Sequence, residues 1–156
     1  MNKCFLGGMA FVVAFGLVLG GCGKKSDQNK QGDGQATVNI GNVNVTAKDE
    51  HSTATIPLPQ NMPSYAAVYP GADVKAVVTV NQADMGTMIS YTTNASPEDV
   101  IAFYKKNAEA ASLEGAQEVR VAGVWNFGAK GKNSAANITV TMVAENGRLS
   151  VQEAYK

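Results

Sequence analysis

Apolar and polar residues alternate in short runs through the second half of the chain, as they do in strands that bury one face. Residues 74–80 and 87–93 are two such runs, and the loop of residues 81–86 between them predicts a β-hairpin. In the first run the residues expected to share an apolar face are Val74, Ala76, Val78 and Val80. In the second run Ile89 and Tyr91 share a face between Thr87 and Thr93.

The segment that follows predicts an amphipathic helix. Ser96 is the expected N-cap, Pro97 takes the first helical position, and Asp99 stands at capping-box spacing from Ser96. Apolar residues then recur at helical spacing along one stripe, namely Val100, Ile101, Tyr104, Ala108 and Ala111. Gly115 is the residue expected to end the helix, because glycine is common just after a helix C-terminus.

Three strands are expected after the helix. The apolar residues expected to share a face of the first are Val119, Val121, Trp125 and Phe127, with Gly123 between them. The second carries Ile138, Val140 and Met142, and the third carries Leu149 and Val151 after the hairpin signal Asn146-Gly147. The order of hairpin, helix and three-stranded meander predicts an α+β domain, an antiparallel sheet with one helix packed on one face.

The N-terminal residues have a different pattern. Lys3 precedes an apolar stretch of about 15 residues, Phe5 to Leu19, which has the length of a signal-peptide core and is short for a membrane-spanning helix. Leu19-Gly20-Gly21-Cys22 then resembles the lipobox of bacterial lipoproteins: an aliphatic residue, two small residues and a cysteine. We therefore expect residues 1–21 to be a lipoprotein signal peptide. An ordinary secretory signal or an uncleaved anchor, with an incidental thiol at Cys22, is the alternative.

The lipobox resemblance implies where the chain is attached. Cleavage would fall between Gly21 and Cys22, and the Cys22 sulfur would carry a diacylglyceryl group, which with further acylation holds a protein firmly to a bilayer. Gly23 stands where lipoproteins kept in the inner membrane carry aspartate. The expected location is therefore the cell envelope, at the outer membrane facing the periplasm if the organism has one.

The segments between this signal and the domain are polar or rich in proline. Residues 22–36 read as the lipidated cysteine and a flexible tether, because they contain no large apolar residue that could stabilise a fold. Residues 37–63 read as an extended segment, strand-like near 37–46 with a bulge at Gly41 and then rich in proline. A strand over 37–45 that pairs with a partner's sheet edge is an open alternative. The globular domain is expected over residues 64–156.

Two motifs of this domain resemble those of a loose group of small bacterial envelope lipoproteins. These are the turn Tyr69-Pro70-Gly71-Ala72 and the helix opening in "SPEDVIAFYKK", from Pro97 to Lys105. The resemblance covers residues 57–156 and implies an envelope location and a small fold of this type. It implies no catalytic residue, because the shared residues form a turn, a helix cap and a helix core.

Composition and charge exclude several functions. Lys+Arg and Asp+Glu each number 13, so the chain lacks the basic excess of a nucleic-acid-binding protein. Both cysteines lie within the first 22 residues, which removes a disulfide framework, a thiolate metal site and a cysteine nucleophile from the domain. The single histidine, His51, follows Asp49 and Glu50 in a polar loop and reads as solvated rather than as a metal ligand.

Few residues remain as candidates for binding. Trp125 and Phe127 could line a groove for a ligand, although such a pair more often fills the core under a helix. Met85 and Met88 have a spacing seen in copper sites, although hairpin or core methionines explain them more simply. We expect a membrane-anchored protein that is not an enzyme, needs no cofactor or metal, and binds an envelope protein or glycan. The alternative is a periplasmic carrier of a small ligand or copper.

Overall fold

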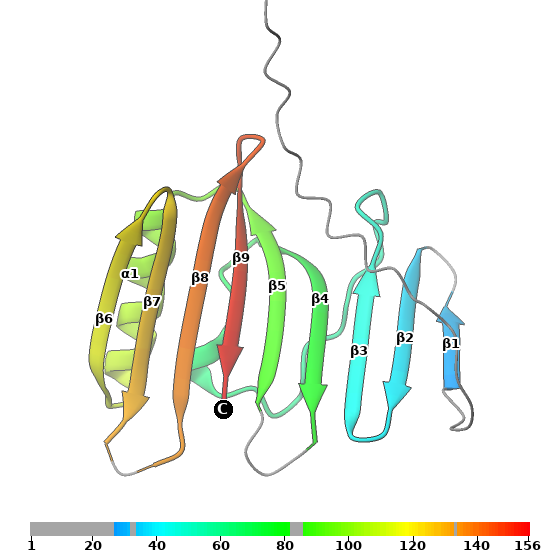
Figure 1. Cartoon of the computed structure of the whole chain (residues 1–156), viewed down its shortest axis with the longest axis horizontal. Helices are drawn as coiled ribbons and strands as arrows, with labels where there is room; N and C mark the ends of the chain where they lie inside the picture. The colour runs from blue at the N-terminus through cyan, green and yellow to red at the C-terminus, as the bar shows by residue number, and fades with distance from the viewer. Residues whose placement is uncertain (1–26, 32–33, 82–85, 133) are drawn as a thin grey trace, which may run out of the picture.

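The structure, a computed structural model, describes residues 27–31, 34–81, 86–132 and 134–156. Within these residues nine strands form one antiparallel sheet in the order β1-β2-β3-β4-β5-β9-β8-β7-β6 (Figure 1). The strands are β1 (Asp27–Gln31), β2 (Gln35–Ile40), β3 (Val43–Lys48), β4 (Asp73–Val80), β5 (Thr87–Thr93), β6 (Leu113–Val121), β7 (Val124–Gly131), β8 (Asn137–Glu145) and β9 (Arg148–Tyr155). The predicted antiparallel sheet with a helix on one face is confirmed, and the sheet has more strands than the sequence indicated.

The helix α1 (Pro97–Ala110) joins β5 to β6 at the far edge of the sheet and packs behind β6 and β7 (Figure 1). It begins as predicted, because the Ser96 hydroxyl accepts a hydrogen bond from the Asp99 N–H at 3.1 Å. Its end was predicted too late. The chain leaves the helix at Ala111 and turns at Ser112, which has a φ of 56°, whereas Gly115 lies inside β6 near a register shift.

The prediction that Val119 through Phe127 form one strand is wrong, because these residues form a hairpin of two strands. Ala122 and Gly123 both have positive φ angles, 49° and 81°, and make the two-residue turn between β6 and β7. Val121 therefore pairs with Val124, which puts Val119 and Val121 on the face away from Trp125 and Phe127. The meander after the helix has four strands, and its last strand, β9, returns to pair with β5.

A bulge in β4 corrects the face predicted for that strand. Val74 pairs with Tyr91 and Val77 with Ile89, and the register shifts between Val74 and Ala76. Because of the extra residue, Val77 lies in the core whereas Val78 lies on the opposite face of the sheet, across from Met88. The prediction that Val74 and Val78 share a face is therefore wrong.

The N-terminal part of the domain also differs from the prediction. Asp27–Gln31, expected in a flexible tether, pairs with β2 as strand β1. Gly41, expected at a bulge, is the first residue of a two-residue turn, so that β2 and β3 form a hairpin that pairs with β4. The strand over 37–45 thus already has a neighbour on each side within this chain. Cys22 and Gly21 lie outside the described residues.

The chain between β3 and β4 covers part of the helix side of the sheet. It contains no strand, and its short 3₁₀ helix η1 (Ser64–Ala66) contacts α1. Ile56 and Ala66 from this segment are buried in the same core as the helix stripe. Tyr69 packs edge-on against Phe103 of α1, with 5.3 Å between the ring centroids. Residues 49–63 therefore belong to the domain and not to a separate link.

Replacing the helix cap should lower the free energy of unfolding. The variant Ser96→Ala removes the acceptor of the Asp99 N–H, and we expect it to cost about 1 kcal/mol. Urea unfolding followed by circular dichroism measures the change. The variant Ser96→Asp, which keeps an acceptor, should retain most of the stability. Equal losses in both variants would show that the cap bond does not stabilise this helix.

Candidate functional site

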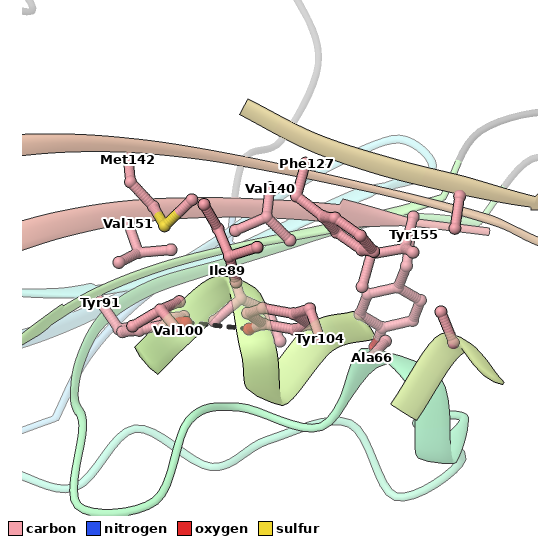
Figure 2. Close-up of a cluster of buried hydrophobic side chains, with 14 of the residues drawn as sticks. Ala66, Ile89, Tyr91, Val100, Tyr104, Phe127, Val140, Met142, Val151 and Tyr155 are labelled. Carbon is pink, nitrogen blue, oxygen red and sulfur yellow. Dashed lines mark hydrogen bonds between the residues drawn. The ribbon is translucent and has the colours of Figure 1, made fainter. Parts of the chain in front are cut away.

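The core contains a buried carboxyl group that the sequence analysis did not identify. Glu153 of β9 is 0% exposed, and its Oε2 accepts a hydrogen bond from the Tyr104 hydroxyl of α1 at 2.9 Å. The Tyr104 hydroxyl lies 2.9 Å from that of Tyr91 on β5, the contact drawn as a dashed line in Figure 2. Either of the two tyrosine hydroxyls can be the donor in this contact. These three side chains are the buried Glu–Tyr–Tyr cluster.

Burial determines the protonation of this cluster. It raises the pKa of Glu153 from its ordinary value of 4.5 to about 8, against a smaller lowering by the Tyr104 hydrogen bond. Burial also raises the pKa of both tyrosines. At neutral pH the carboxyl is therefore protonated, and its Oε1 has no hydrogen-bond partner among the residues that the structure describes. The carboxyl and Tyr104 have no exposed surface, so the cluster is part of the core that joins α1 to the sheet.

The residues predicted to line a ligand site lie in or beside the same core. Phe127 is buried, and its ring stacks on that of Tyr104 with 6.4 Å between the centroids (Figure 2). Trp125 is half-buried at the edge of the core, and the Arg120 guanidinium lies 4.8 Å from its ring centroid. Phe127 therefore fills the core under the helix, the simpler of the two interpretations. Trp125 is only partly buried, and the Arg120 guanidinium covers one side of its ring.

The candidate metal residues are not brought together. His51 is exposed in the loop after β3, and the described residues contain no group of three or more histidine, cysteine or acidic side chains that could hold a metal ion. Met88 is 42% exposed on the sheet face away from the helix. Its proposed companion, Met85, lies outside the described residues.

An apolar surface covers the sheet face opposite the helix, at the end formed by β2, β3 and β4. Pairing in register aligns its side chains in two rows across the strands, an end row and an inner row. The end row is Ile40, Val43 and Val80, and the inner row is Val38, Val45, Val78 and Met88. We call these two rows the apolar patch. On the helix side β2 and β3 carry the polar residues Thr37, Asn39, Asn44 and Thr46, whereas β4 carries Thr79 and the buried Val77.

The apolar patch is uncovered within the part of the chain that the structure describes. Ile40 is 64% exposed and Met88 42% exposed, and the valines of β3 and β4 are half-buried by their neighbours. A hollow of about 330 Å³ adjoins the patch where Val78, Val80 and Met88 meet Ala154 and Tyr155 of β9. Exposed apolar side chains that lie next to one another are a feature of interaction sites. The alternation in the sequence could have revealed these side chains, but not the face on which they lie.

Comparison with known proteins places the chain in a family. A family model described as "START domain-like" matches residues 74–152, just over half of the chain, and the chain belongs to that family. No curated protein matches. Among solved structures, the solution structure of cyanobacterial PsbP (CyanoP) from Synechocystis sp. PCC 6803 is similar at 13% identity, with a TM-score of 0.38. The alignment covers 88% of this chain and 86% of that one.

The described residues contain no helix that is both long enough and apolar enough to span a membrane.

The buried carboxyl should make stability depend on pH. Between about pH 4.5 and 8 the folded protein holds a proton on Glu153 that the unfolded chain has lost. The free energy of unfolding should therefore fall as pH rises through this window, by about 1.4 kcal/mol per pH unit at most, and level off above it. Urea unfolding at pH 5, 6, 7 and 8 measures the slope.

The variant Glu153→Gln tests whether Glu153 causes this dependence of stability on pH. Glutamine keeps an oxygen for the Tyr104 hydroxyl and cannot ionise, so the fall in stability between pH 5 and 8 should largely disappear. Glu145→Gln, at an exposed position at the end of β8, is the matched control and should keep the wild-type slope. An unchanged slope in Glu153→Gln would mean that another group is responsible.

Proposed function

We propose that this chain is a lipid-anchored protein of the bacterial cell envelope whose domain binds a partner through the apolar patch without catalysing a reaction. The observation that carries the proposal is the position of the patch: its two rows lie on the sheet face away from the helix, across β2, β3, β4 and β5. Water-exposed valine, isoleucine and methionine in adjacent rows cost free energy that a partner's apolar surface recovers on binding.

The position of the patch relative to the expected anchor supports the proposal. Strand β1 begins at Asp27, five residues after Cys22, and is separated from the patch strand β3 only by β2. An acylated Cys22, cut after Gly21, would hold the patch close to the membrane, where an envelope protein or a glycan could reach it. Strand β1, at one free edge of the sheet, has only polar residues. At the other edge Glu118 of β6 forms an ion pair with Lys105 of α1 at 2.7 Å, and Val119 and Val121 are exposed.

Carriage of a small ligand is the second candidate, and the hollow of about 330 Å³ beside Met88 favours it. Its walls include Val78 and Val80, so an apolar ligand would fit better than a charged one. Titration with copper(I) and with apolar ligands, followed through the backbone NMR signals of Val78, Val80 and Met88, would detect either kind of cargo. Shifts at these positions with a small molecule alone would favour carriage over partner binding.

In-cell crosslinking and pull-down of the tagged protein test the proposal. The variant Cys22→Ser should leave the lipidated membrane fraction and lose the crosslinked partner. The variant Met88→Asp should stay in the membrane fraction but lose the partner, because a charge in the inner row opposes apolar contact. Its free energy of unfolding should change by less than about 0.5 kcal/mol, as expected of an exposed position.

The matched control is Val121→Asp, an exposed valine of β6 at the other edge of the sheet. It should keep both the membrane fraction and the partner. Loss of the partner in Val121→Asp and not in Met88→Asp would place the binding surface at the β6 edge. Unchanged behaviour of Cys22→Ser would exclude the lipid anchor.

A further inference from the structure

The β2–β3 hairpin ends in an apolar, uncharged tip. Its residues are Ile40-Gly41-Asn42-Val43, and Ile40 has the largest exposed fraction of the exposed large apolar side chains that the structure describes. Gly41, with a φ of 59°, makes the turn. The Asn81 N–H at the end of β4 donates to the Asn42 carbonyl at 2.7 Å, so the tip is held against the sheet. Ile40 therefore presents a large apolar side chain at a hairpin tip that is hydrogen-bonded to the end of β4.

The start of β1 lies at the same end of the sheet as the tip. Asp27 pairs with Asn39, the residue before Ile40 (Figure 1). Five residue steps separate Asp27 from Cys22, and a chain of that length spans at most about 18 Å whatever its conformation. A lipid on Cys22 would therefore keep the bilayer surface within a short distance of Ile40.

We infer that the tip of the β2–β3 hairpin is a membrane-contact surface, in which Ile40 and Val43 of the end row enter the headgroup region of the bilayer that holds the Cys22 lipid. This inference rests on the proposed lipid anchor. The lipid supplies most of the binding, and the tip sets the orientation of the domain. With the end row against the bilayer, the inner row of the apolar patch stays open beside the membrane, so membrane contact and partner binding use different side chains.

The opposite corner of the sheet offers a matched reference. Val121 ends β6 at the other edge and at the other end of the sheet, and its exposed fraction of 63% equals that of Ile40 to within one per cent. If exposure alone brought an apolar side chain into the bilayer, both corners would enter it. If the anchor determines the contact, only the tip does.

Site-specific fluorescence in vesicles tests the inference. The variants Ile40→Cys and Val121→Cys of the mature lipidated protein are labelled with a polarity-sensitive thiol probe and reconstituted in phosphatidylethanolamine–phosphatidylglycerol vesicles. With Cys4 removed in the signal and Cys22 acylated, the introduced cysteine is the only free thiol. We expect the probe at position 40 to shift its emission to shorter wavelength and to be quenched by spin-labelled lipid. The probe at position 121 should show neither effect.

Each other outcome overturns the inference in an identifiable way. Equal, water-like emission at both positions would mean that the tip does not touch the bilayer while the anchor is intact. A shift at position 40 that persists in dilute detergent, without quenching by spin-labelled lipid, would mean that a second copy of the chain covers the tip. Mass spectrometry of the purified protein determines separately whether Cys22 is acylated. An unacylated Cys22 would contradict both the proposed lipid anchor and this inference.

Discussion

The hydrogen bond from Tyr104 to Glu153 is the constraint on which the arrangement of helix and sheet depends. It joins the middle of α1 to β9, and the contact of Tyr104 with Tyr91 extends it to β5. A carboxyl group in an apolar core is costly unless it is neutral and hydrogen-bonded, so only helix positions that bring a donor to Glu153 are acceptable. Sliding α1 by one turn would leave both partners unsatisfied. The cluster thus selects one position of the helix on the sheet, where apolar packing alone would tolerate several.

The elements that the sequence predicted well are those with local signals. Ser96 and Pro97 define the start of the helix by capping and backbone preference, and Asn146-Gly147 defines the last hairpin because both residues adopt the positive φ that its turn requires. Such features need no knowledge of the rest of the fold. They gave the helix, the β4–β5 hairpin and the β8–β9 hairpin.

The features that were missed depend on distant residues or on unusual backbone. Ala122 takes a positive φ that alanine rarely adopts, so the turn between β6 and β7 left no clear signal and two strands read as one. The alternation of Leu149 and Val151 placed Glu153 on the buried face, yet a charged residue there argues for solvent. Its partner Tyr104 lies 49 residues earlier, and no local pattern connects them.

The β4 bulge was also missed because it is a backbone irregularity with no local sequence signal. It creates the candidate site. Without the extra residue after Val74, strict alternation would turn Val78 toward the helix with Tyr91 and its neighbours. With it, Val78 joins Val45 on the open face, and the inner row of the apolar patch lines up across four strands, β2 to β5. The composition of the patch was therefore readable from the sequence, but its existence as a surface follows from one backbone irregularity.

The position of β9 has a consequence for how the protein is made. This strand is formed by residues 148–155, at the C-terminal end of the chain, and it lies between β5 and β8. Until those residues have emerged from the ribosome, the strands before the helix and the strands after it have no common neighbour, and Tyr104 has no carboxyl to bind. The nine-stranded sheet can therefore close only after residues 148–155 are available to pair with both β5 and β8.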